Sequence, residues 1–201
     1  GDGTGSIIGN ISDGGSGFAV EYFGGTVQVG PTTGTNSYGS TLINEDYNGA
    51  FNLPQLTTVR LLNSNAFSLG PVSLKGLVRL DMNGVTATIS NLLDITTITA
   101  NGTSNSPVVA NNSSTTAATL SLGADGTNQV FTGKFINGST QPLSLTKIGN
   151  GTLTISGDST TTGTITVANG TLALGTNSAL YPDSSPVQGT GSFSNATLIT
   201  I

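Results

Sequence analysis

The sequence of 201 residues contains no cysteine and no histidine. Without cysteine the chain can form neither disulfide bonds nor thiolate nucleophiles. Without histidine it lacks the commonest general base and the usual protein ligand of transition metals. Two classes of nucleophilic site and the usual transition-metal centres are therefore excluded before any motif is considered.

Charge is also scarce, with ten acidic and five basic side chains and a formal net charge of −5 at pH 7. The five cations are scattered, whereas a nucleic-acid interface needs lysine and arginine in clusters. No apolar run reaches the roughly 18 residues of a membrane-spanning helix. We therefore expect neither nucleic-acid binding nor a membrane span. Because no signal peptide begins at Gly1, we also expect a mature or excised piece of a protein.

The carboxylates form no recognisable cluster in the sequence. Glu45 and Asp46 are adjacent, and we expect this pair on a solvated loop, because neighbours in a strand would point to opposite faces. Asp2, Asp125 and Asp158 stand next to glycines and are typical of turns in which the carboxylate caps backbone N–H groups. A calcium site is the alternative, although the known calcium-loop motifs are absent. The sequence thus predicts no catalytic residue, no metal ligand and no cofactor.

Glycine is abundant, with 29 residues, and its spacing is the strongest structural signal. Between residues 151 and 175 the glycines recur five to seven residues apart, and apolar residues alternate with threonine, serine or alanine in each interval. Leu153 and Ile155, for example, should point to one face of a strand and the intervening Thr154 to the other. Short strands separated by glycine corners predict an all-β, single-stranded parallel β-helix, or solenoid, in which glycine supplies the positive φ of each sharp corner.

An antiparallel β-sandwich is the alternative fold. Asn-Gly pairs begin at residues 137, 150 and 169, and this dipeptide is typical of two-residue hairpin turns. No capped helical pattern occurs in the chain, so helix content should be close to nil in either fold.

Three motif elements lie in the same stretch: F-x-G at 131–133, K-x-G-x-G-T-L-x-(L/I)-x-G at 147–157, and G-x-(T/I)-x-V-x-x-G-x-L at 163–172. On these elements the segment resembles the autotransporter-associated β-strand repeat, also called the passenger-associated transport repeat. The resemblance implies a right-handed parallel β-helix in the extracellular part of large bacterial surface or secreted proteins. It implies no catalytic residue.

Weaker repetition extends along the whole chain. Gly25-Thr26-Val27-Gln28-Val29, for example, falls beside Gly151-Thr152-Leu153-Thr154-Ile155. We therefore interpret residues 1–201 as a single β-solenoid domain. With about 20 residues per turn and about 4.8 Å between strands, about nine or ten turns would form a rod on the order of 45 Å long. The predicted parts are a worn repeat copy at 1–53, intervening turns at 54–129, a clear copy at 130–175 and the start of a next copy at 176–201.

Aromatic residues crowd into the start of the chain, where six of the eleven occur within the first 51 residues. We expect them to be core plugs near one end of the coil, with a contact surface for a neighbouring subunit as the alternative. These residues are Phe18, Tyr22, Phe23, Tyr38, Tyr47 and Phe51.

An open coil leaves unpaired backbone groups at both ends, and low charge protects such edges poorly. A head-to-tail contact that does not close on itself generates a filament. We therefore predict a non-catalytic extracellular structural protein of the bacterial cell surface, a solenoid subunit or stalk that stacks into a homo-polymeric fibre. An adhesin or passenger domain that binds a glycan or host surface is one alternative. A polysaccharide-active enzyme is another, but it would need a cluster of carboxylates that the sequence does not show.

Overall fold

The structure, a computed structural model, describes residues 3–48, 53–98 and 104–175. Within these ranges the chain forms 21 β-strands and no helix. Every strand pairing in the larger sheets is parallel. Because no helix is present in the described residues, none is long and apolar enough to cross a membrane.

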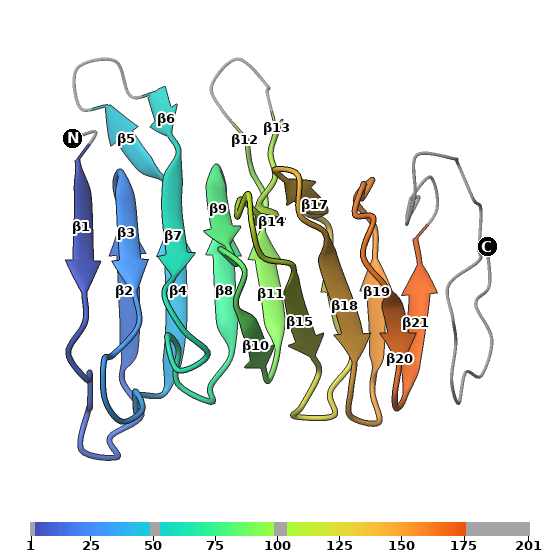
Figure 1. Cartoon of the computed structure of the whole chain (residues 1–201), viewed down its shortest axis with the longest axis horizontal. Helices are drawn as coiled ribbons and strands as arrows, with labels where there is room; N and C mark the ends of the chain where they lie inside the picture. Colours follow the sequence, from blue (N-terminus) through green and yellow to red (C-terminus); the bar gives the residue numbers. More distant parts are fainter. Residues whose placement is uncertain (1–2, 49–52, 99–103, 176–201) are drawn as a thin grey trace.

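The longest sheet has six strands, to which the chain returns again and again along the long axis of the molecule (Figure 1). We call each passage from one strand of this sheet to the next a lap, and name the lap after its first strand. The last described lap begins at Thr160, which forms an isolated parallel bridge with Ile136 of this sheet. The strands in order are β1 (Thr4–Ile7), β3 (Thr26–Val29), β7 (Thr57–Leu61), β9 (Val78–Asp81), β14 (Val108–Asn111) and β17 (Lys134–Gly138).

A second side of the molecule consists of a four-stranded and a three-stranded sheet, which meet where β11 lies beside β16. The four-stranded sheet contains β2 (Ala19–Phe23), β4 (Ser40–Asn44), β8 (Val72–Lys75) and β11 (Leu92–Ile95). The three-stranded sheet contains β16 (Gln129–Phe131), β19 (Thr152–Ile155) and β21 (Thr171–Leu174).

A third side carries another four-stranded sheet, which we call the β10 sheet. It contains β10 (Thr86–Ile89), β15 (Ala118–Leu122), β18 (Leu143–Lys147) and β20 (Ile165–Val167). Within the described residues the β1, β3 and β7 laps contribute no strand to it. In those laps the residues after the six-stranded sheet form loops instead.

Antiparallel pairing occurs in two short hairpins. They are β5 (Asp46–Asn48) with β6 (Leu53–Gln55), and β12 (Thr97–Ile98) with β13 (Ser104–Asn105). Each hairpin connects a strand of the second side to the next strand of the six-stranded sheet, and both lie at the same edge of the molecule, at the top of Figure 1.

The strand register places inward side chains directly on their equivalents in the next lap. Leu153 pairs with Leu172, and Leu145 pairs with Ile165, and all four are buried. These side chains belong to a continuous apolar core. Burial of each such side chain contributes about 1.5–3 kcal/mol, so the alternation read from the sequence is the main stabilising pattern of the fold.

Glycine is required at the corners for two different reasons. Gly170 has a φ of 70°, as predicted for a sharp corner. Gly157 and Gly163 do not have positive φ, and a Cβ atom there would instead overlap the carbonyl oxygens of Gly133 and Leu143 in the preceding lap. At those two corners glycine is required because consecutive laps approach each other closely, and the positive-φ explanation is wrong for them.

The parallel all-β prediction is confirmed, and the antiparallel sandwich is wrong. The Asn-Gly pair at 137 does not form a hairpin, because Gly138 ends β17 and the chain continues to β18 in another sheet. The parallel sheets agree with a β-solenoid, while closure of the coil and its nine or ten turns remain predictions. The proposed repeat copies do not share a place in the fold: residues 26–29 lie in the six-stranded sheet and 152–155 in the three-stranded one. The domain division also remains a prediction, and its last part, 176–201, lies outside the described residues.

Candidate functional site

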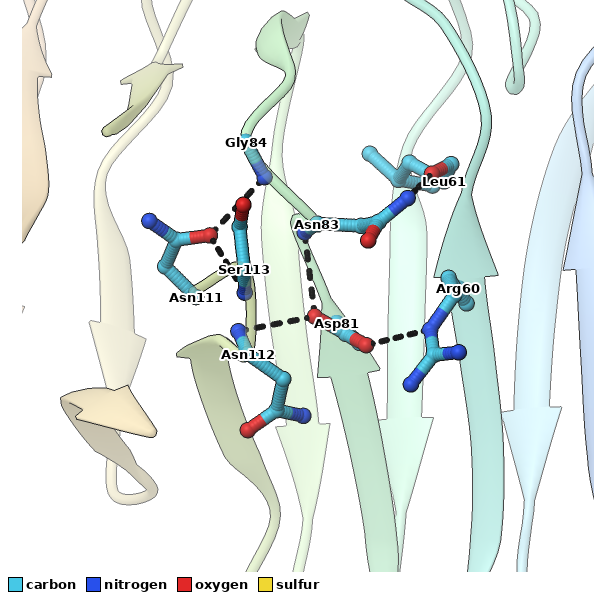
Figure 2. Close-up of polar contacts among 8 residues, drawn as sticks. All are labelled: Arg60, Leu61, Asp81, Asn83, Gly84, Asn111, Asn112 and Ser113. Atoms are coloured by element: carbon cyan, nitrogen blue, oxygen red, sulfur yellow. Dashed lines mark hydrogen bonds and ion pairs between the residues drawn. The ribbon is translucent and has the colours of Figure 1, made fainter. Parts of the chain in front are cut away.

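A buried polar network surrounds Asp81, at the end of β9 (Figure 2). Its Oδ2 atom accepts a hydrogen bond from Nε of Arg60 at 2.7 Å. Its Oδ1 atom accepts from the backbone N–H groups of Asn83 and Asn112, each at 3.0 Å. The donors come from the β7, β9 and β14 laps, so one fully buried carboxylate joins three consecutive laps.

Asn111, in the adjacent strand β14, continues the network. Its Oδ1 atom accepts from the N–H groups of Gly84 at 2.8 Å and Ser113 at 3.3 Å, as Figure 2 shows. Its Nδ2 atom donates to the carbonyl oxygens of Thr116 and Pro142, both at 3.0 Å. This buried amide therefore bonds the β9, β14 and β17 laps together.

The network is suited to a structural role. Both oxygens of Asp81 are occupied by donors, and a buried carboxylate is tolerable only when it is compensated in this way. Across the residues that the structure describes, no three histidine, cysteine or carboxylate side chains come together as a metal site would require. The arrangement holds laps in register and offers no general acid paired with a second carboxylate.

Glu45 corrects the sequence interpretation. We predicted a solvated loop, but its side chain is only 3% exposed. Its Oε2 atom accepts from the N–H of Leu77 at 2.7 Å and from Nδ2 of Asn105 at 3.2 Å. Glu45 precedes the β5–β6 hairpin, and Asn105 belongs to the β12–β13 hairpin, so this carboxylate bonds the bases of both hairpins. Its neighbour Asp46 begins β5.

Asp125 confirms the turn prediction. Its Oδ1 atom accepts from the N–H and the hydroxyl of Thr127, both at 3.0 Å, and its Oδ2 atom accepts from Nδ2 of Asn91 at 3.0 Å. Partial burial raises the pKa of Asp125, but these hydrogen bonds outweigh it and hold the pKa below its usual value. Asp158 is exposed, and Asp2 lies outside the described residues.

Lys147, the lysine of the repeat motif, has a role that the sequence analysis did not assign. Its side chain is only 2% exposed, and Nζ donates to the carbonyl oxygens of Ile148 and of Gly149, the latter at 2.8 Å. Burial lowers the pKa of Lys147, while the nearby Asp125 opposes this shift. In the sequence, the only sign of this role was that the lysine precedes a glycine corner.

The aromatic residues at the start of the chain fall into two groups. Tyr22 and Tyr38 are buried, as expected of core residues, and burial together with Tyr38 raises the pKa of Tyr22 well above its usual value. Phe18 and Phe23 are 68% and 64% exposed. Both lie at or beside β2, an edge strand of its sheet. The side chains of Tyr47 and Phe51 are outside the described set.

A cavity of about 600 Å³ lies on the third side of the molecule, over the loops of the first three laps. These loops occupy the place that the later laps fill with strands of the β10 sheet. Neither composition nor motif spacing indicated this cavity, because it results from strands that are absent. The residues that line it include Asn36, Tyr38, Phe67, Leu69, Thr86 and Thr88.

Comparison with known families matches a passenger-associated-transport-repeat model to residues 145–174. This segment is similar to that repeat. The match confirms the resemblance seen in the sequence and runs from within β18 to the end of β21, where the alternation is clearest. Passenger-associated transport repeats belong to autotransporter passenger proteins, which are secreted to the cell surface. Among curated proteins and among solved structures, nothing matches the chain.

Proposed function

We propose that the protein is a non-catalytic structural component of the bacterial cell surface, a right-handed β-helix that stacks end to end with further copies into a fibre. The repeat match at 145–174 supports the extracellular location. The observation that carries the stacking is that β1 and β2, each at the edge of its sheet, have one strand edge that pairs with no other strand among the described residues.

The free edge of β1 can be assigned residue by residue. The carbonyl oxygens of Gly3 and Ile7 accept from Thr26 and Gly30 in the next lap, both at 3.1 Å. In a strand, alternate residues turn their N–H and C=O groups to opposite sides. Thr4 and Ser6 therefore turn their backbone groups away from β3, toward the open end.

The edge of β2 has the same character. The carbonyl oxygen of Phe18 accepts from the N–H of Gly39 at 2.8 Å, so Val20 and Tyr22 also face β4. Glu21 and Phe23 then turn their backbone groups outward, and Phe23 adds an exposed aromatic ring. Open edges of this kind are templates for pairing with another chain, and each hydrogen bond so formed contributes about 0.5–1.5 kcal/mol.

Proline at the free edge tests the stacking. Ser6→Pro removes an outward N–H group without breaking the backbone bonds between β1 and β3, so the fold should persist while fibres become shorter or disappear. Ser6→Val keeps the N–H group and should leave fibre formation unchanged. Electron microscopy and sedimentation over a range of concentrations measure the outcome. A monodisperse monomer of the unaltered protein at high concentration would contradict the proposal.

The two hairpins favour an adhesin as the second candidate function. Both lie at one edge of the molecule, and the buried Glu45 joins their bases, so they are held beside each other (Figure 1). Loops held by a rigid scaffold are common binding elements. Glu45→Gln should loosen this pair and weaken any binding to a glycan array, whereas an array without a single hit for the unaltered protein would argue against the adhesin.

A further inference from the structure

β10 is the first strand of the β10 sheet, and among the described strands it pairs with β15 alone. The carbonyl oxygen of Ile89 accepts from the N–H of Gly123 at 3.3 Å, which fixes the direction of the backbone groups. Ala87 and Ile89 face β15. Thr86 and Thr88 must then turn their N–H and C=O groups to the opposite, open edge.

This edge adjoins the cavity, because Thr86 and Thr88, the two residues with outward backbone groups, are the β10 residues that line it. Within the described part of the chain, neither residue has a hydrogen-bond partner on that side. Unpaired N–H and C=O groups that alternate along a strand are complementary to another extended backbone. The cavity thus lies where one more strand of the sheet would run.

The lining indicates the chemistry of that strand. Phe67 and Leu69 form an apolar wall, and Leu69 is 88% exposed, which leaves its side chain largely in water. Among the described residues of the lining the one carboxylate is Asp13, which already accepts from the N–H groups of Gly15 at 2.8 Å and Phe18 at 2.7 Å. No lysine or arginine lines the cavity. An incoming segment should therefore be uncharged, with apolar side chains toward this wall.

We propose that the open edge of β10 binds an extended, uncharged segment of another protein, which adds a strand to the β10 sheet. A second copy of this chain is a poor fit for this edge, because its own open strands, β1 and β2, belong to sheets of several strands. A free segment is thin enough to lie between β10 and the loops of the first three laps. This site is independent of stacking, because it lies on the side of the molecule and not at the end.

A labelled peptide tests the site directly. The probe is Ala-Ala-Thr-Leu-Ser-Leu-Gly, the sequence of residues 117–123, acetylated and amidated, because this segment already pairs with the other edge of β10. We expect saturable binding by fluorescence anisotropy. N-methylation of alternate residues of the peptide should abolish binding, because it removes the N–H groups that pair with β10.

Three variants locate the binding. Thr88→Pro removes an outward N–H group of β10 and should weaken binding by about tenfold or more, since it also blocks close approach of the new strand. Thr88→Val keeps the N–H group and should bind nearly as the unaltered protein does. Glu21→Pro removes an outward N–H group at the β2 edge, where the cavity does not reach, and should leave peptide binding unchanged.

Leu69→Ser tests the apolar wall of the cavity without changing the backbone, and it should weaken peptide binding several-fold. Far-UV circular dichroism checks that each variant retains its sheets. Absence of binding by the unmethylated peptide overturns the proposal, as does unchanged binding to a folded Thr88→Pro protein. Equal loss in Glu21→Pro would place the peptide at the end of the molecule. Dimerisation of the unaltered protein that Thr88→Pro abolishes would show that a second copy occupies the edge, and either result overturns the proposal.

Discussion

The third side of the molecule is built in two ways, and the boundary lies at β10. From the β9 lap onward, it consists of parallel strands whose inward residues, such as Leu120 and Leu145, are buried in the core. In the first three laps, the corresponding residues form loops at 8–18, 30–39 and 62–71.

In the strand region, the backbone itself joins the laps. Leu120 pairs with Leu145 and Leu145 with Ile165, so each lap hydrogen-bonds the next through its main chain. Apolar side chains stack behind this ladder. Backbone pairing of this kind repeats at every residue and tolerates many side chains on the outward face, where serine and threonine prevail.

In the loop region, a few backbone bonds still join the laps, such as that from the N–H of Ser37 to the carbonyl oxygen of Ile11 at 2.9 Å, and asparagine side chains supplement them. The buried Asn36 accepts from the N–H of Ile11 and donates to the carbonyl oxygen of Ala66, both at 2.8 Å, and so joins three laps. Nδ2 of Asn63 donates to the carbonyl oxygen of Pro31 at 2.9 Å. These bonds depend on single residues. The comparison therefore predicts that the strand region is sensitive to backbone crowding and the loop region to loss of particular amides.

The largest expected effect is in the strand region, from Gly149→Val. Gly149 has a φ of 69°, and a Cβ atom there would overlap the carbonyl oxygen of Gly123 in the preceding lap. Backbone strain and the clash together should lower the free energy of unfolding by about 4 kcal/mol or more. Urea denaturation measures the loss.

Gly5→Val in β1 is the matched control for Gly149→Val, because nothing lies within 4 Å of a Cβ atom at Gly5 and its φ is not positive. We expect a change within about 0.5 kcal/mol at this site. A similar loss in the two variants would show that glycine is not required by contacts between laps.

Asn36→Ala should have the next largest effect, in the loop region. The substitution leaves the N–H of Ile11 and the carbonyl oxygen of Ala66 without their partner, and each unsatisfied buried group costs about 1–3 kcal/mol. Hydrogen exchange should accelerate in the first three laps while the β10 sheet remains protected.

Asn150→Ala is the corresponding change in the strand region. Asn150 accepts from Nδ2 of Asn169 at 2.8 Å, but both residues are exposed, so the loss should stay within about 0.5 kcal/mol. If the two asparagine variants unfolded at the same urea concentration, amide bonds between laps would not distinguish the two regions.

The same comparison explains what the sequence could reveal. In residues 152–174, apolar and hydroxyl residues alternate at the strand period, and burial follows the alternation closely: Leu153, Ile155 and Leu172 are all inside. Local pattern and global fold agree there, and that is also where the family model matches. The parallel fold could be inferred because this local pattern is strong.

The residues that escaped prediction depend on contacts between distant laps. Glu45 is buried because Asn105, 60 positions further along the chain, closes over it. Asn36 looks like an ordinary turn residue, and its two partners are set by how the loops stack. The edge of β10 is open because three earlier laps lack a strand. No local pattern encodes these features, since each arises only after the laps are in register.

The smallest expected effect concerns acid stability. The pKa of Asp125 is held below its usual value, so as pH falls toward 2 the unfolded chain takes up the proton first. The stabilisation is complete above the usual carboxyl pKa of about 4, and is lost as pH falls through the lower pKa of the folded state. Asp125→Asn should therefore lower stability at pH 7 and flatten the loss between about pH 5 and pH 2.

Asp13 provides the comparison in the loop region, since hydrogen bonds from Gly15 and Phe18 also hold its pKa below the usual value against the opposing effect of desolvation. The carboxylate of Asp125 accepts from Asn91 in the preceding lap, whereas the carboxylate of Asp13 accepts only from residues of its own loop. Asp125→Asn should therefore accelerate hydrogen exchange in both the β9 and β14 laps, and Asp13→Asn only around residues 13–18. If hydrogen exchange accelerated over equally large regions in the two variants, side-chain bonds between laps would contribute nothing beyond the local turn. That result would remove the basis for distinguishing the two regions.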